Sequence, residues 1–177
     1  MVSFSKHYDK EVVPEMMARF EYKSRMAVPR LKKIVVNIGV GKREEKEREE
    51  IRKHLESILG QKLVGAKAKQ AIAGFKTREG MIIGYKATLR GRRMYDFLDR
   101  LIRIAMPRTR DFRGLDIKSV DSGGHLTIGI REHIVFPEMI GADVKTIFGF
   151  EVTLVSSARN REEAIEFYKL MGIPFKK

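Results

Sequence analysis

Four stretches of the chain alternate between apolar and polar residues, and this period of two predicts β-strands. In residues 31–40 the apolar face consists of Ile34, Val36, Ile38 and Val40. The opposite face of that stretch is small and polar, with Lys33, Val35, Asn37 and Gly39. Residues 81–90, 126–131 and 150–156 alternate in the same way. In residues 81–90 the polar side holds Gly84, Lys86, Thr88 and Arg90.

Two further stretches in the first half have apolar residues at helical spacing. Residues 8–22 place apolar or aromatic side chains four apart, and Pro14 is expected to kink this helix or to start its second part. Residues 44–59 have acidic residues in the first turns and Gly60 directly after the last one, which is typical of a helix with a glycine terminator. Its buried stripe is Ile51, Leu55, Ile58 and Leu59.

The second half predicts two more helices. Residues 92–105 have a continuous apolar stripe, and their outer face suggests two ion pairs, Asp96–Arg100 and Asp99–Arg103. The last helix is expected to begin at Asn160, with Glu163 in the capping-box position. Strands and helices interleave irregularly, so residues 1–177 are predicted to form a single α+β domain. It has a mainly antiparallel sheet of at least four strands, helices packed on one face, and basic loops.

The charge of the chain points to a polyanionic partner. Lys and Arg number 36 against 23 Asp and Glu, which gives a formal net charge of +13. Residues 61–120 carry 15 basic and 5 acidic side chains, so most of the excess lies in the middle third. A nucleic-acid surface needs such a concentration of cations to displace counterions.

Several other classes of protein are disfavoured. The chain has no cysteine, which excludes disulfides, thiolate metal sites and a cysteine nucleophile. Its N-terminus is charged, and no apolar run approaches the about 20 residues that span a bilayer. We therefore expect an intracellular, cytoplasmic protein with no membrane partner, no metal, no cofactor and no small-molecule substrate.

Two short motifs resemble catalytic or nucleotide sites without meeting their requirements. Residues 39–43 (GVGKR) match neither phosphate-loop pattern and predict a tight strand-to-helix turn. Residues 121–124 (DSGG) lie between alternating stretches, as a turn would, although they resemble the segment around a catalytic serine. No two histidines have the spacing of helical metal ligands. An RNA-processing enzyme using Asp111, Asp116 and Asp121 stays open as the alternative function, and sequence-specific DNA binding ranks third.

Two basic segments and one sheet face fit RNA binding instead. Residues 66–80 carry Lys67, Lys69, Lys76 and Arg78 around Phe75. Residues 107–114 carry Arg108, Arg110 and Arg113 beside Phe112. Each phenylalanine could stack on a base or anchor its loop to the core. If the first three strands are neighbours, their small polar face could approach a ribose-phosphate backbone closely.

These residues resemble the bacterial large-subunit ribosomal protein L5 family. The similarity is carried by MAVPRLKKIVVNIGVG at 26–41, GQK at 60–62, IAGFKTREGMIIG at 72–84, TLRGRRMYDFLDRLI at 88–102 and PRTRDFRG at 107–114. The resemblance implies a structural protein without catalysis that binds 5S rRNA in the central protuberance. It also implies 23S rRNA, P-site tRNA and a small-subunit head ribosomal protein as partners.

The resemblance also assigns residues by position. The 5S rRNA contacts are expected at Lys33, Asn37, Gln61, Phe75, Thr88 and Arg90. The loop facing tRNA is expected at residues 67–80, with Lys67, Lys69, Lys76 and Arg78.

Overall fold

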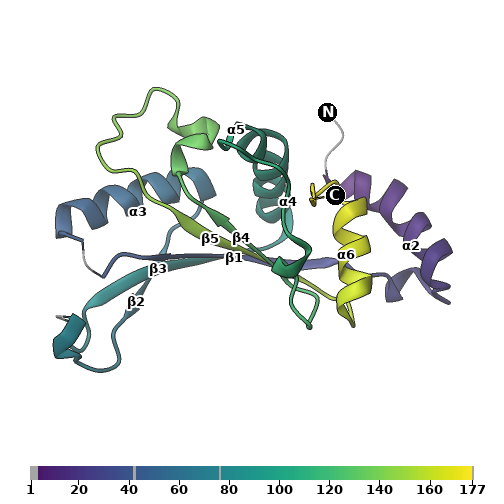
Figure 1. The fold of residues 1–177 in the computed structure, drawn as a ribbon, viewed down its shortest axis with the longest axis horizontal. Coiled ribbons are helices and arrows are strands. Elements are labelled where there is room, and N and C mark those ends of the chain that lie inside the picture. Colours follow the sequence, from purple (N-terminus) through teal and green to yellow (C-terminus); the bar gives the residue numbers. More distant parts are fainter. Residues whose placement is uncertain (1–3, 42, 76, 177) are drawn as a thin grey trace.

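Five antiparallel strands form one sheet in the computed structural model, which describes residues 4–41, 43–75 and 77–176 (Figure 1). The strands are β1 (Leu31–Gly39), β2 (Val64–Lys67), β3 (Ile82–Leu89), β4 (Leu126–Ile130) and β5 (Phe150–Ser156). Their spatial order is β2-β3-β1-β5-β4, so the first long strand is central. The α+β class and the antiparallel sheet are therefore confirmed, with one strand more than the minimum expected.

The buried apolar residues of β1, β3, β4 and β5 point to the same side of the sheet, whereas Val64 of β2 lies exposed opposite Lys86. In β1 the buried side chains include Ile34, Val36 and Ile38, and their partners across the ladders include Leu89, Ala87, Leu154 and Val152. Helices α3 (Glu45–Leu59), α4 (Gly91–Arg100), α5 (Met106–Arg108) and α6 (Arg161–Leu170) contribute to this core, as do Val12 and Met16 near the N-terminus and Phe136 and Phe148 after β4. Figure 1 shows α3, α4 and α5 along this side. The prediction that helices pack on one face is confirmed.

The N-terminal helix is longer and less regular than predicted. It runs through α1 (Phe4–His7), the π-helical turn η1 (Tyr8–Val12) and α2 (Val13–Phe20), with Pro14 in the first turn of α2. The same arrangement recurs where the π-helical turn η4 (Leu101–Ala105) leads into α5 and Pro107. A π-helical turn widens the backbone, which accommodates a residue that has no N–H to donate.

The remaining short elements are 3₁₀ turns. These turns are η2 (Arg25–Ala27), η3 (Ala73–Phe75), η5 (Ile117–Ser119), η6 (His133–Val135) and η7 (Pro137–Met139). The N-cap of α6 and the glycine after α3 are present as expected, but the Glu163 carboxylate accepts the N–H of Arg159 instead of the N-cap N–H that a capping box would use. Gly60 ends α3 with φ of 62°, and the Oδ1 of Asn160 accepts the N–H of Glu163 at 2.9 Å. Within the described ranges, no helix combines the length and the apolar character needed to cross a bilayer.

One of the two predicted ion pairs on α4 is wrong. Asp99 and Arg103 do pair, at 3.1 Å. Asp96 pairs with Arg92 instead, and Arg100 pairs with Glu138 of η7 while its Nε donates to the backbone carbonyl of Asp96. The segment that brings Glu138 to α4 is 38 residues away in the chain, so helical spacing could not reveal this partner.

Candidate nucleic-acid interface

The side of the sheet that faces away from the helices is polar, and we call it the open face. Ladder register places Asn37 between Lys86 on β3 and Glu151 on β5. One step along, Val35 lies between Thr88 and Thr153, and the hydroxyl of Thr153 lies 3.2 Å from that of Thr127 on β4. The predicted polar faces of β1 and β3 therefore lie side by side, whereas that of β4 is separated from them by β5, so the expectation that all three strands are neighbours is wrong for β4.

Four of the six residues expected to contact 5S rRNA lie on this face or at its end. Lys33, Asn37 and Thr88 alternate with core residues of β1 and β3, as predicted. Arg90 follows β3 in extended backbone, and the Ile34–Leu89 pairing brings it opposite Lys33. Asn37 and Arg90 are exposed, and Lys33 and Thr88 are half-buried. The structure thus brings together two cations, an amide and a hydroxyl.

Glycines keep the open face flat. Gly39 on β1 is paired with Gly84 on β3. A Cβ added at Gly84 would lie 2.7 Å from the carbonyl oxygen of Ile38. At Gly39 and at Gly129 on β4 an added Cβ would meet nothing within 4 Å. Strands with this composition let another backbone approach closely.

Glu151 is a functional feature that sequence reasoning missed. It is exposed beside Asn37 and opposite Gly129. Its carboxylate repels phosphates from the part of the face around β5, next to Asn37. Anionic ligands are therefore favoured on the β1 and β3 half, where Lys33, Lys86 and Arg90 lie.

Gln61 has a contact within the protein. Its Nε2 donates to the backbone carbonyl of Thr88 at 3.2 Å, which ties the connection after α3 to β3. The side chain is half-buried beside the open face. Lys76 and the side chain of Phe75 lie outside the described residues, so their predicted contacts have no structural description.

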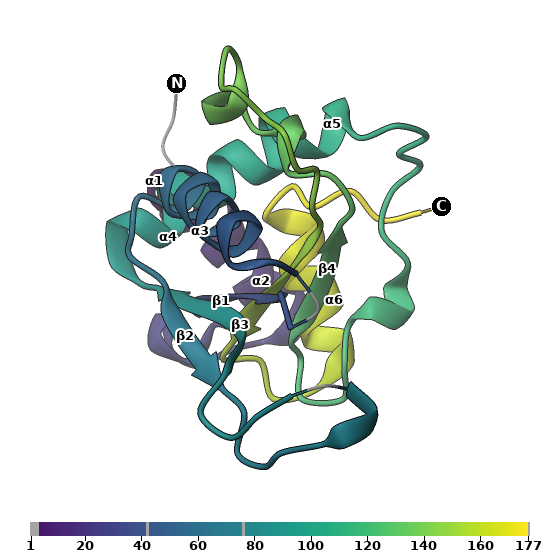
Figure 2. The ribbon, with the colours of Figure 1, turned by 90° about the vertical axis from the view of Figure 1, so that its left-hand side faces the viewer.

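The expected tRNA-facing loop is the end of a β-hairpin. Beyond β2 and β3 the ladder continues with two more backbone hydrogen bonds. The Ala68 N–H donates to the carbonyl of Met81 at 2.8 Å, and the Gly80 N–H donates to the carbonyl of Ala68 at 3.0 Å. A bridge between Ile72 and Thr77 closes the hairpin tip, which we define as residues 67–81, from the end of β2 onward. Figure 2 shows the tip projecting beyond the sheet. The described cations are exposed: Lys67, Lys69 and Arg78.

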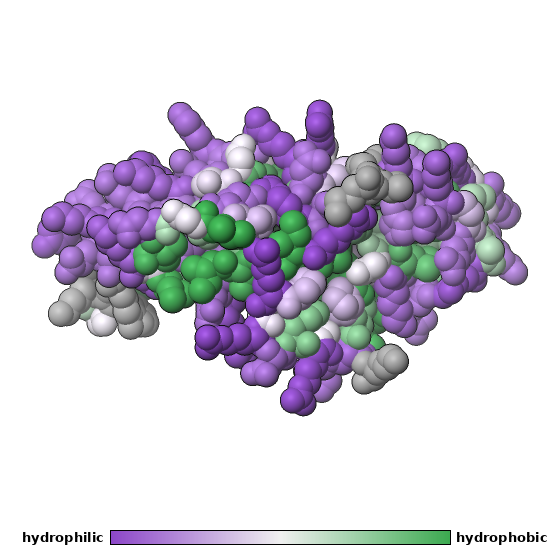
Figure 3. All heavy atoms as spheres, turned by 90° about the horizontal axis from the view of Figure 1, so that it is seen from above, coloured by the Kyte–Doolittle hydropathy of each residue, from purple (hydrophilic) through white to green (hydrophobic). Residues whose placement is uncertain are grey.

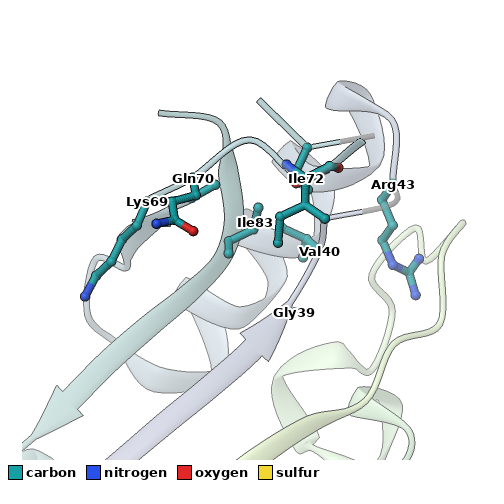
Figure 4. A pocket seen from close by; sticks show the side chains of 10 residues that line it. Gly39, Val40, Arg43, Lys69, Gln70, Ile72 and Ile83 are labelled. Atoms are coloured by element: carbon teal, nitrogen blue, oxygen red, sulfur yellow. Dashed lines mark hydrogen bonds between the residues drawn. The ribbon is translucent and has the colours of Figure 1, made fainter. Parts of the chain in front are cut away.

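A hollow of about 790 Å³ lies between the hairpin tip and the turn after β1. Figure 4 shows Val40, Ile72 and Ile83 converging on its centre, with Lys69 and Arg43 extending away on opposite sides. The Val40 N–H donates to the carbonyl of Ile83 at 2.8 Å, and the Arg43 N–H donates to that of Val40. Residues 39–41 and Arg43 therefore belong to a tight strand-to-helix turn, as the sequence predicted, and Lys42 lies outside the described residues.

Two of the three candidate catalytic aspartates, Asp116 and Asp121, have structural contacts. The Oδ1 of Asp121 accepts the N–H of His125 at 2.8 Å within a turn closed by Gly124. The Oδ1 of Asp116 accepts the N–H of Lys118 at 2.9 Å. Over the described ranges, no three His, Cys, Asp or Glu side chains are grouped as metal ligands would be.

Residues 131–149 form an irregular segment that lies over α3. Glu50 of α3 holds it: Oε1 accepts the N–H groups of Lys145 and Thr146 at 3.0 and 3.2 Å, and these bonds lower the pKa of the Glu50 carboxyl. The ring of His133 is fully buried and stacks on Phe148, with centroids 3.9 Å apart. Burial lowers the pKa of His133 to about 4.

The outer surface of this segment is apolar. Ile134, Ile140 and Ile147 are 40, 69 and 56% exposed. Figure 3, which looks onto the helix-covered side, shows apolar surface gathered in the region where this segment lies. An exposed apolar patch rimmed by polar residues is typical of a protein contact.

Comparisons with known proteins cover nearly the whole chain. Residues 24–78 match the family model described as Ribosomal protein L5, and residues 82–175 match the model for the C-terminus of the same ribosomal protein family. The chain is 49% identical over 177 residues to the Large ribosomal subunit protein uL5 of Halothermothrix orenii, which covers 99% of each chain. It is 46% identical to the protein of that name from Alkaliphilus metalliredigens, with all of both chains covered. For the protein of that name from Mycoplasma pneumoniae the identity is 48%, over 100% of this chain and 99% of that one.

Proposed function

The chain belongs to the ribosomal protein L5 family, and from this membership we propose that it holds 5S rRNA in the central protuberance of the large ribosomal subunit. It is a structural component of the ribosome, in the cytoplasm, and has no enzymatic role. The 5S rRNA lies along the open face. Residues Lys33, Asn37, Thr88 and Arg90 contact it, and Gln61 supports Thr88 from the edge.

The flat, polar open face is the observation that carries this proposal. Helices cover the other side of the sheet, whereas this side presents cations and short polar groups from β1 and β3. Recognition of folded RNA depends on shape, phosphates and 2′-hydroxyls more than on base edges. Lys33 and Arg90 suit phosphates, and the Asn37 amide and Thr88 hydroxyl suit 2′-hydroxyls.

A carboxylate placed on the open face tests the proposal. Gly39→Glu adds a side chain where nothing lies within 4 Å of the new Cβ, so the fold can accept it. Because the new charge faces phosphates, affinity for 5S rRNA should fall at least about tenfold, or about 1.4 kcal/mol, in a filter-binding titration.

The matched control adds the same charge elsewhere. Ser57→Glu lies on the exposed side of α3, and its affinity for 5S rRNA should stay close to that of the unmodified protein. Equal losses in both variants, or no loss in Gly39→Glu, would place the 5S site elsewhere.

The hairpin tip is the part that we assign to P-site tRNA. Lys67, Lys69 and Arg78 are exposed there, at the end of β3 opposite to Arg90. Lys76 belongs to the same assignment by its place in the chain. A hairpin that extends beyond the sheet can reach a second RNA while the open face holds the first.

The apolar patch on residues 131–149 is the surface that we assign to a small-subunit head protein. Ile134, Ile140 and Ile147 are exposed, and Glu50 holds the backbone of the segment against α3. The 23S rRNA is the remaining proposed partner, since 5S rRNA must be attached to the rest of the large subunit.

A further inference from the structure

A cationic hollow of about 340 Å³ lies at the edge of the sheet formed by β4. Three parts of the chain line it: the segment 106–115 after α4, the end of β4, and the C-terminus. Its charged residues are Arg110, Asp111, Arg113, Arg131 and Lys176. We call this feature the edge hollow.

Backbone hydrogen bonds fix the shape of the edge hollow. The Leu115 N–H donates to the carbonyl of Pro174, and the Lys176 N–H donates to that of Leu115, both at 2.8 Å. Gly114 directly precedes Leu115 and has φ of 96°. A Cβ added there would lie 2.7 Å from the backbone nitrogen of Lys176. Phe112 packs against the core, so it anchors the segment from below.

The cations of the edge hollow have no acidic partners within the described part of the chain. Arg110, Arg113, Arg131 and Lys176 appear in no ion pair there, whereas Arg19 and Arg100 are paired with carboxylates from other elements. Asp111 is the one acidic residue among the described lining residues. The edge hollow therefore carries a fixed excess of positive charge around a space that can hold an anion.

The edge hollow is separated from the 5S half of the open face. Strand order places β4 at one edge and the β2–β3 hairpin at the other. Between Asn37 and the β4 edge, the open face presents the exposed carboxylate of Glu151 next to Gly129. An RNA that avoids Glu151 cannot follow the face from one cationic area to the other.

We propose that the edge hollow is a second RNA site, which binds the phosphate backbone of an RNA helix other than the one on the open face. The proposal rests on the proposed function, because it assumes that 5S rRNA occupies the β1 and β3 half of the open face. Arg110 and Arg113 provide the main phosphate contacts, and Arg131 and Lys176 flank them. Such contacts position an RNA without reading its sequence.

The test uses the full chain already bound to 5S rRNA, with a short labelled RNA duplex of unrelated sequence as the probe. The charge variant is Arg110→Gln/Arg113→Gln. The geometry variant is Gly114→Ala, which keeps every charge but must push the segment away from Lys176. The control, Arg52→Gln/Lys53→Gln, removes two exposed cations from α3 and leaves the net charge equal to that of the charge variant.

We expect the charge variant to bind the duplex about tenfold more weakly near 0.1 M salt, with the slope of log affinity against log salt reduced by about two. Gly114→Ala should weaken duplex binding too, and the control should differ little from the unmodified protein. Affinity for 5S rRNA should be unchanged in all three.

Three results would overturn the proposal. A loss as large in the control would mean that only the net charge matters. Weaker 5S binding in the charge variant would mean that the edge hollow is part of the 5S site. This outcome would leave the proposed function intact. Competition by polyglutamate at concentrations equal to those of the duplex would show that the edge hollow takes acidic protein instead.

Discussion

At the scale of a single residue, two groups of Thr88 have different roles, one in the fold and one in the proposed RNA contact. Its backbone carbonyl accepts the Gln61 amide, whereas its hydroxyl belongs to the open face. Thr88→Ala keeps the first contact and removes the second. Affinity for 5S rRNA should fall by about 1 kcal/mol, typical of one hydrogen bond, with little change in the thermal midpoint.

Thr153→Ala is the matched control for Thr88. It is in the same row of the open face, but its hydroxyl lies 3.2 Å from that of Thr127, on the Glu151 side. Its affinity for 5S rRNA should change less than that of Thr88→Ala in the same titration. Unchanged affinity with lowered stability in Thr88→Ala would show that Thr88 serves packing.

His133 makes the stability of the protein depend on pH. Its pKa is lowered to about 4 because the ring is buried, while in the unfolded chain it returns to about 6.5. As the pH falls from about 6.5 to about 4, the imidazole takes up a proton in the unfolded chain before it does so in the folded one. The His133 contribution should then lower the free energy of unfolding by up to about 3 kcal/mol between pH 6.5 and pH 4, as measured in urea titrations.

A variant without the titrating ring isolates this effect. His133→Phe keeps a ring to stack on Phe148, although it loses the acceptor Nδ1 that lies 3.4 Å from the Phe148 nitrogen. Its stability curve should be flatter than that of the unmodified protein between pH 6.5 and pH 4. Parallel curves would mean that other groups cause the dependence.

The residues of the open face were predictable to the extent that they depend on alternation within one strand. Asn37 and Thr88 face away from the core because their sequence neighbours are apolar. Glu151 was missed because its place beside Asn37 depends on pairing between strands far apart in the chain. Arg100 was assigned the wrong partner for the same reason.

At the scale of elements, the N-cap of α6 has a measurable contribution. The Oδ1 of Asn160 accepts the N–H of Glu163 at 2.9 Å, which satisfies one of the free donors of the first turn. Asn160→Ala should lower the free energy of unfolding by about 1 kcal/mol. A urea titration should show a lower midpoint with an unchanged slope, and Asn160→Asp, which keeps the acceptor, should restore it.

The hairpin tip should act independently of the open face. Changing Lys67, Lys69 and Arg78 to Ala removes three exposed cations whose carbon stems lie outside the core. Binding to 5S rRNA should be largely retained, whereas assembled ribosomes should bind P-site tRNA less tightly.

A control with equal charge is available for the hairpin. Changing Lys46, Arg52 and Lys53 to Ala removes three exposed cations from α3, and ribosomes with this variant should bind tRNA normally. Loss of 5S rRNA by the hairpin variant in a filter-binding titration would assign the tip to the primary RNA site.

Most long elements could be predicted, and β2 could not. Strands β1, β3, β4 and β5 have clear alternation, but Val64–Lys67 reads VGAK, which has one residue of high strand propensity. It becomes a strand because its ladder to β3 holds it. The π-helical turns were also missed, since the apolar stripe continues through them and only the prolines that follow mark a change.

For the whole molecule, the fold divides a charge that is continuous in sequence. The middle third of the chain begins in the β2–β3 hairpin at one edge of the sheet. It then passes through α4 and reaches the edge hollow at the other edge. The sequence shows one basic region, whereas the structure has two basic surfaces with Glu151 between them.

The central position of β1 affects how the chain acquires its structure during synthesis. β1 is the first strand made, but one of its two neighbours, β5, is the last. The contacts between them close a loop of most of the chain, which slows folding. Until β5 emerges, one edge of β1 is unpaired, and the adjacent Lys32 and Lys33 protect it from pairing with other chains. A chain that still lacks β5 therefore relies on these two lysines to limit association through the open edge of β1.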